Sequence, residues 1–135
     1  MGPGRTETFQ MRTDEDVLRV RQTVRIWMVE QRNFGLVDQT KMVTAARELG
    51  RNVVVHGRGG TARLELLADG GRRGIRVTFQ DHGPGIANVE QALRDGFTTG
   101  DGLGLGLGGS RRLVDDFEIE SEVGKGTRVT ITKWK

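Results

Sequence analysis

The stretch DHGPGI at residues 81–86 directly follows a segment of alternating apolar residues, 74–80, that predicts a β-strand. An aspartate at the end of a strand, here Asp81, can accept a hydrogen bond from an exocyclic amine such as that of adenine. Gly83 and Gly85 allow the backbone to pass close to a flat base, which larger side chains would block. A plain tight turn is the alternative, but two glycines around one proline exceed what most turns need.

A helix expected upstream of this strand carries two polar residues on one face. We expect Asp38 to cap this helix and His56 to end it. Its buried stripe recurs at helical spacing and consists of Met42, Ala46, Leu49 and Val53. Glu48 and Asn52 are four residues apart, so both can act on one ligand. A carboxylate there can take a proton from an attacking hydroxyl, and an amide oxygen can coordinate Mg²⁺. Such pairs are common on exposed helices, so this pair alone does not indicate a ligand site. It becomes evidence for one only together with the motif at 81–86.

A glycine-rich stretch downstream is the third candidate for ligand binding. Residues 100–110 alternate glycine with leucine and lead into a predicted helix over 110–116. Unhindered backbone N–H groups and the positive end of a helix dipole form a cradle for a polyphosphate, and the long loop 95–109 is typical of a functional lid. A Gly-x-Gly-x-x-Gly at 104–109 lacks the preceding strand of a dinucleotide-binding fold. The chain also lacks a P-loop and the His-Arg-Asp and Asp-Phe-Gly motifs of eukaryotic kinases.

The remaining segments predict helices and paired strands that are segregated along the chain. The expected elements are a strand at 5–12, a helix from a capping box at Thr13 to a stop near Gly35, a hairpin of 61–68 and 74–80 joined by residues 69–74, a short helix capped by Asn88 and running to about Arg94, and a closing hairpin of 117–123 and 127–133. This order favours an α+β two-layer sandwich, with a mixed and mostly antiparallel sheet covered on one face by helices. We expect one domain over 1–135, with a disordered tail at residues 1–4.

Length and composition are those of a small cysteine-free domain with an anionic partner. The 135 residues carry no cysteine, which excludes disulfides and thiolate metal sites, and two histidines without a carboxylate at ligand spacing are poor zinc ligands.

No signal peptide and no run of about 18 apolar residues is present, so we expect a cytoplasmic chain without a membrane partner. The net charge of +3 suits a nucleotide, a nucleic acid or an acidic protein. Trp27 and Trp134 lie on or beside apolar stripes and are interpreted as packing, so nucleic-acid binding rests on charge alone.

In order and spacing these motifs resemble those of the Bergerat-fold (GHKL) ATPases and kinases, which include gyrase and the histidine kinases. The Gly-Thr pair at 126–127 matches a further family feature, in which the hydroxyl supports the adenine-binding Asp. The resemblance implies that Glu48 is catalytic and that Asn52 holds Mg²⁺. It also implies an ATP site, to which we assign Asn52, His56, Asp81, Gly83, Gly85, Ile86, Gly102, Leu103, Gly104, Leu105, Gly106 and Thr127.

Within this superfamily the chain is most similar to the small switch serine/threonine kinases of bacterial stress signalling. The likeness lies in ARELGRN at 46–52, DGFTTG at 95–100, the short lid and the ending TKW at 132–134. It implies phosphorylation of a Ser or Thr in a STAS-domain protein, followed by release of the kinase to activate a PP2C-type phosphatase. An anti-sigma factor, or another nucleotide-gated binding module of the same fold, is the alternative. A homodimer is compatible with the resemblance.

Overall fold

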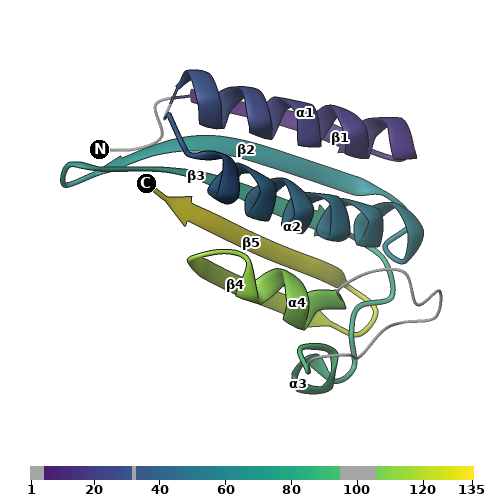
Figure 1. Cartoon of the computed structure of the whole chain (residues 1–135). Coiled ribbons are helices and arrows are strands. Elements are labelled where there is room, and N and C mark those ends of the chain that lie inside the picture. Colours follow the sequence, from purple (N-terminus) through teal and green to yellow (C-terminus); the bar gives the residue numbers. More distant parts are fainter. Residues whose placement is uncertain (1–4, 32, 95–105) are drawn as a thin grey trace.

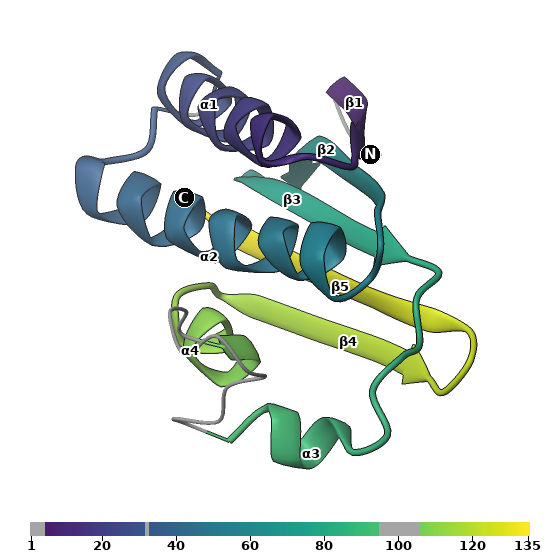
Figure 2. The same ribbon diagram turned by 90° about the vertical axis from the view of Figure 1, so that its right-hand side faces the viewer.

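The computed structural model describes residues 5–31, 33–94 and 106–135, which form two layers (Figure 1). The elements are β1 (Arg5–Met11), α1 (Asp14–Glu30), α2 (Leu36–Val55), β2 (Gly60–Asp69), β3 (Arg72–Asp81), α3 (Val89–Ala92), α4 (Gly106–Arg112), β4 (Asp116–Glu122) and β5 (Gly126–Trp134). The strands form one sheet in the order β1-β2-β3-β5-β4, and all four pairings among the described strands are antiparallel. Figure 2 shows α1, α2 and α4 on the same side of this sheet. The predicted α+β two-layer sandwich with a mostly antiparallel sheet is therefore confirmed. The tail predicted at residues 1–4 lies outside the described residues.

The core lies between the sheet and the two long helices. Alternation along each strand directs one set of apolar side chains toward the helices. The buried apolar strand residues include Ala62, Leu64 and Leu66 of β2, Ile75, Val77 and Phe79 of β3, and Val129 and Ile131 of β5. They meet the stripe predicted on α2, whose members are all buried. Burying one such side chain stabilises the fold by about 1.5–3 kcal/mol, so the core holds α2 firmly over β3 and β5. None of the helices described is long and apolar enough to cross a membrane.

The N-terminus of α2 differs from the prediction, whereas its C-terminus agrees. The helix begins at Leu36, two residues before Asp38, with Gly35 as its N-cap and without a side-chain cap. The predicted start was wrong because Leu36 and Val37, the first helical residues, are exposed. They do not belong to the buried stripe from which the helix was predicted. Asp38 instead lies 3.5 Å from the ammonium of Lys133 on β5. At the other end His56 is the C-cap, as predicted.

The helix after the glycine-rich stretch starts four residues earlier than predicted. It covers Gly106–Arg112 rather than 110–116, although glycine disfavours helix interiors. Tertiary packing overrides that preference, because Leu107 is buried and a Cβ on Gly108 would lie 2.2 Å from the carbonyl oxygen of Leu93. Only a glycine at this position allows α4 to pack so closely on the chain that follows α3.

The connection after α1 and the β2–β3 turn differ from the prediction. Helix α1 ends at Glu30 rather than near Gly35, because Asn33 adopts a left-handed φ of 54° and the N–H of Phe34 donates to the carbonyl of Met28 at 2.8 Å. The β2–β3 hairpin turns at Gly70 and Gly71, which have φ angles of 57° and 90°, instead of over 69–74. Positive φ at two central residues is typical of the two-residue turns that match strand twist.

The predicted capping box at Thr13 is present and makes stability depend on pH. The backbone N–H groups of Arg12 and Thr13 donate to Asp16 Oδ2 at 2.8 and 3.0 Å. The hydrogen bond from Arg12 is the main cause that lowers the pKa of the Asp16 carboxyl below its ordinary value of 3.8. A lowered folded-state pKa adds stability above the unfolded pKa, which is lost as the pH falls through the folded pKa. We expect the unfolding free energy, measured in urea, to fall more steeply below pH 3.8 in the wild type than in Asp16→Asn. Equal slopes would contradict this prediction.

Candidate functional site

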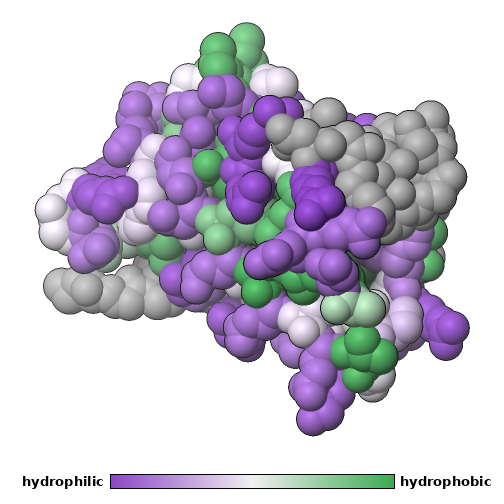
Figure 3. Space-filling view, turned by 90° about the horizontal axis from the view of Figure 1, so that it is seen from below, coloured by the Kyte–Doolittle hydropathy of each residue, from purple (hydrophilic) through white to green (hydrophobic). Residues whose placement is uncertain are grey.

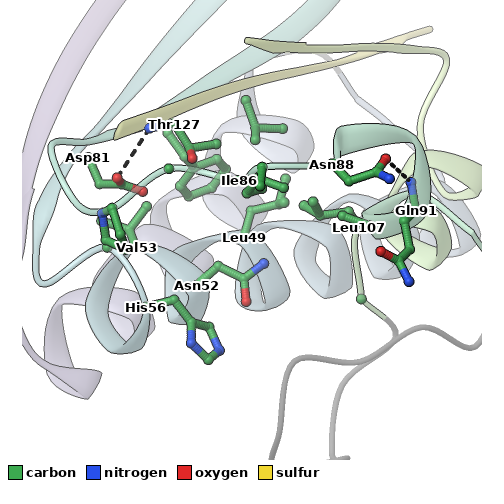
Figure 4. A pocket seen from close by; sticks show the side chains of 18 residues that line it. Leu49, Asn52, Val53, His56, Asp81, Ile86, Asn88, Gln91, Leu107 and Thr127 are labelled. Carbon is green, nitrogen blue, oxygen red and sulfur yellow. Dashed lines mark hydrogen bonds between the residues drawn. The ribbon is translucent and has the colours of Figure 1, made fainter. Parts of the chain in front are cut away.

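One cavity of about 460 Å³ opens beside α2 and draws on segments far apart in sequence. Asn52 and His56 come from α2, Asp81 comes from the end of β3, and Thr127 comes from the start of β5 (Figure 4). The lining residues are Leu49, Asn52, Val53, His56, Gly57, Phe79, Asp81, Pro84, Gly85, Ile86, Ala87, Asn88, Gln91, Ala92, Gly106, Leu107, Thr127 and Val129. The cavity therefore lies where the three sequence motifs converge.

The walls of the cavity are mainly apolar. Nine apolar side chains contribute to them: Leu49, Val53, Phe79, Pro84, Ile86, Ala87, Ala92, Leu107 and Val129. Figure 3, which views the molecule from the side of α3 and α4, shows apolar surface between hydrophilic side chains there. Polar groups gather in a few places, and Figure 4 shows Asp81 and Thr127 beside each other at one end. Apolar walls with few placed polar groups suit a flat ligand that carries a small number of hydrogen-bonding atoms.

Asp81 is buried at that end, with 9% of its surface exposed. The backbone N–H groups of Gly83 and Thr127 donate to its Oδ1 at 2.9 and 3.2 Å. Both bonds use the same oxygen, so Oδ2 is the atom through which the carboxylate can accept a hydrogen bond from a ligand. Gly57 makes room for this oxygen, because a Cβ there would lie 2.5 Å from Oδ2.

The glycines of the 81–86 motif pack against protein backbone. A Cβ on Gly83 would lie 2.8 Å from the Cα of Gly57, and Gly83 does not line the cavity. Gly85, with a φ of 78°, does line it, and a Cβ there would lie 2.3 Å from the carbonyl oxygen of Glu122. These glycines bring the chain after β3 against the end of α2 and the β4–β5 hairpin, which shapes the polar end of the cavity.

Glu48 lies next to the cavity rather than in its wall. It is buried, with 7% of its surface exposed, and stands one helical turn before Asn52, which lines the cavity. Its Oε2 lies 3.7 Å from Nη1 of Arg47. Gly106, the first residue of α4, also lines the cavity. The other lid residues predicted to bind phosphate lie outside the described residues; these are Gly102, Leu103, Gly104 and Leu105.

A profile of the family described as "Histidine kinase-like ATPase domain" matches residues 11–133. The chain belongs to this family. Among its relatives, the serine/threonine-protein kinase RsbT of Bacillus subtilis is 38% identical over 122 residues, which are 90% of this chain and 91% of RsbT. The anti-sigma F factor of Anoxybacillus flavithermus is 31% identical over 112 residues, which are 78% of this chain and 75% of that factor.

A solved structure agrees with this membership at the level of the fold. The crystal structure of the RsbU and RsbW domains of a Mycobacterium tuberculosis protein matches with a TM-score of 0.67 and 22% identity. The match covers 98% of this chain and 34% of that one. The predicted resemblance to the GHKL superfamily is confirmed, and the histidine kinase-like ATPase fold accounts for a cavity that suits ATP.

Several residues of this cavity were missed in the sequence. Gly57, the α3 N-cap Asn88 and the α3 residues Gln91 and Ala92 contribute to the cavity, but no motif marks them as ligand-binding. Ser121 on β4 contacts Thr127, with 2.8 Å between the two hydroxyl oxygens. A signal for Ser121 was available, because it occupies an inward position of β4 where the alternation calls for an apolar residue.

Two glycines at the β4–β5 turn differ in how much space a larger side chain would find around them. Gly124 and Gly126 have φ angles of 83° and 114°, so alanine is strained at either position. Only at Gly126 would a Cβ also collide with backbone, 2.2 Å from the carbonyl oxygen of Asp81, whereas nothing lies within 4 Å at Gly124. We expect Gly124→Ala to lower the unfolding free energy by about 1 kcal/mol and Gly126→Ala by about 3 kcal/mol or more, as measured in urea. Equal losses would show that close packing at Gly126 contributes little.

Proposed function

We propose that this chain is an ATP-dependent protein serine/threonine kinase of a bacterial partner-switching module. The observation that carries the proposal is the cavity with Asp81 and Thr127 at one end and Asn52 in its wall, one helical turn from the buried carboxylate Glu48. Similarity to RsbT over 90% of the chain supports a kinase in particular. The adenine ring occupies the apolar part of the cavity, and its 6-amino group donates to Asp81. His56, Gly85, Ile86 and the lid residues 102–106 complete the nucleotide site, and Gly83 supports it from outside the cavity wall by donating its N–H to Asp81.

The donor groups of the cavity fit Mg²⁺ that is bound together with phosphates. Among the described residues, no group of three or more His, Cys, Asp or Glu could hold a metal ion by protein ligands alone. Asn52 offers one amide oxygen, which suits an ion that keeps several waters and takes its other ligands from a substrate. Mg²⁺ bound in this way would neutralise negative charge on the phosphates during transfer.

Glu48 is the candidate general base of the transfer. Its carboxylate accepts the proton of a Ser or Thr hydroxyl on the acceptor protein, and the hydroxyl oxygen attacks the γ-phosphorus. The bond between the γ-phosphorus and the β–γ bridging oxygen breaks, so the products are a phosphoprotein and ADP. The side chain is buried and its Oε2 lies 3.7 Å from Nη1 of Arg47, so less side-chain freedom has to be lost when the base meets the acceptor hydroxyl than at an exposed position.

The acceptor and the downstream partner are proposed from the likeness to RsbT. The chain transfers phosphate to a STAS-domain protein in the cytoplasm and then dissociates to activate a PP2C-type phosphatase. Similarity to the anti-sigma F factor favours a second candidate function, in which ATP binding gates a protein contact. Every nucleotide-binding residue serves both functions equally, so phosphate transfer to a STAS-domain protein distinguishes them.

The decisive experiment incubates the chain with Mg²⁺, γ-labelled ATP and a STAS-domain protein from the same organism. We expect label on a Ser or Thr of the STAS-domain protein, and ADP formed in equal amount. If the chain binds ATP but transfers no label at any ratio of the two proteins, the kinase proposal is wrong. Capture of a sigma factor in an ATP-dependent manner would then favour the second candidate function.

The role of Asn52 is tested by the Mg²⁺ dependence of ATP affinity. Calorimetric titration with ATP, with Mg²⁺ and with EDTA, measures the gain in affinity due to the metal. We expect Asn52→Ala to reduce that gain at least about tenfold, because it removes the amide oxygen that binds the ion. Gln91→Ala is the matched control, since it removes another amide that lines the same cavity. A normal gain in Asn52→Ala would remove Asn52 as the metal ligand.

A further inference from the structure

The side of α2 that carries Glu48 also carries basic residues before and after it. Lys41 and Arg51 stand seven residues before and three residues after Glu48, spacings that place the three side chains along one stripe of the helix. Arg47 stands next to Glu48, and 47% of its side chain is exposed. The candidate base is therefore bordered by three cations.

Helix α4 extends this basic surface. It packs beside α2 (Figure 2), and its last turn carries Arg111 and Arg112, both of which are exposed. All residues of these two helices are described, and their only acidic residues are Asp38 and the buried Glu48. The carboxylate of Asp38 lies 3.5 Å from the ammonium of Lys133. The basic side chains of α2 and α4 thus far exceed the negative charge on the same two helices.

An acceptor protein has to lie over this surface in order to be phosphorylated. Glu48 is buried, so a Ser or Thr hydroxyl reaches its carboxylate only if the acceptor covers the neighbouring part of α2. Cations that are covered by a partner need opposite charges on that partner, because like charges and unpaired charges oppose association. The contact of 3.7 Å between Arg47 and Glu48 is longer than a hydrogen bond, which allows Arg47 to turn toward a carboxylate of the acceptor.

Two features of the surface favour an acidic protein over a nucleic acid. Neither α2 nor α4 contains an aromatic side chain on which a base could stack. Glu48 also lies within the row of cations, and its negative charge opposes a phosphate backbone that would run along that row.

We propose that α2 and α4 form the docking surface for the acceptor, which presents carboxylates beside its phosphorylated Ser or Thr. This inference rests on the proposed kinase function and adds the chemistry by which the acceptor is recognised. Seven residues of α-helix span roughly 10 Å. A carboxylate that contacts Lys41 therefore lies about that far from the hydroxyl that meets Glu48.

Charge reversal at Lys41 tests the docking surface. Lys41 is exposed and lies about two helical turns from Glu48, so Lys41→Glu should keep the fold, kcat and the KM for ATP. The KM for the STAS-domain protein should rise about tenfold, because an attraction is lost and a repulsion is added, whereas Lys41→Gln should raise it about threefold. Lys125→Glu is the matched control. It makes the same change in net charge at the exposed β4–β5 turn and should keep the wild-type KM.

A charge swap in the acceptor identifies the contact. An exposed Asp or Glu about 10 Å from the phosphorylated residue of the STAS-domain protein is replaced by Lys. This change should raise the KM with the wild-type kinase and lower it again with Lys41→Glu, which is the coupling expected of two residues in contact. Higher salt should raise the KM of the wild type more than that of Lys41→Glu, because salt screens the attraction.

The outcomes separate this inference from the proposed function. A KM for the STAS-domain protein that is unchanged in Lys41→Glu would overturn the inference and leave the kinase proposal standing. Lys41→Glu that loses binding of a labelled DNA or RNA oligonucleotide, but keeps the KM, would assign the surface to a nucleic acid instead. If the wild type transfers no phosphate, the kinase proposal is wrong. Calorimetric affinities of the STAS-domain protein for the wild type and Lys41→Glu then decide the docking surface, and equal affinities would overturn it.

Discussion

Replacement of Glu48 by glutamine is expected to lower the rate of phosphoryl transfer to a STAS-domain protein about 10²- to 10⁴-fold, which is the usual contribution of a general base. Glutamine has nearly the same shape but cannot accept the proton of the attacking hydroxyl. Glu48 lies beside the cavity and not in its wall, so affinity for ATP should change by less than about threefold, or about 0.7 kcal/mol. Single-turnover transfer of label measures the rate, and calorimetric titration measures the affinity.

The control for this change is a carboxylate outside the site. Glu30 is exposed at the end of α1, and Glu30→Gln should transfer phosphate at the wild-type rate. Thermal unfolding of both variants checks that the buried position at 48 tolerates glutamine. If Glu48→Gln keeps its fold and transfers phosphate normally, Glu48 is not the base.

Replacement of Asp81 by asparagine is expected to weaken ATP binding about 100-fold or more, because a charge-assisted hydrogen bond to the adenine amine is lost. The amide of asparagine keeps an oxygen that can accept from Gly83 and Thr127, as Oδ1 of Asp81 does now. Its amino group must then replace Oδ2 and would oppose the amine of the base. We therefore expect a large loss of affinity with a change in unfolding free energy of only about 1 kcal/mol.

The adjacent residue provides the matched control. His82 is exposed and does not line the cavity, so His82→Gln should bind ATP as the wild type does. Titration of both variants with ATP measures the difference. Tight binding by a folded Asp81→Asn variant would show that the base is held elsewhere in the cavity.

The elements that were predicted correctly from the sequence are those determined by interactions between residues close together in the chain. Alternation in β2 and β3, the apolar stripe of α2 and the capping box at Thr13 involve neighbours along the chain, and all were predicted correctly. The ends of α1 and of the β2–β3 hairpin were missed because of local turn geometry, whereas the errors at α4 and α2 fell where long-range packing competes with local preference. At α4, contact of Gly108 with Leu93 outweighs the low helix propensity of a glycine-rich segment, and at α2 Asp38 pairs with Lys133 instead of capping the helix.

The sequence by itself therefore determined the kinds of elements, the family and the motif residues that converge on the cavity. Only the tertiary structure decided how those residues are arranged. It placed Asn52 in the wall with Glu48 beside it, and it joined Asp81 to Thr127 and Ile86 to Ser121 across 46 and 35 residues of chain. Hydrogen bonds between residues so far apart in the chain cannot be predicted from periodic patterns in the sequence, because they depend on how distant strands align in one sheet.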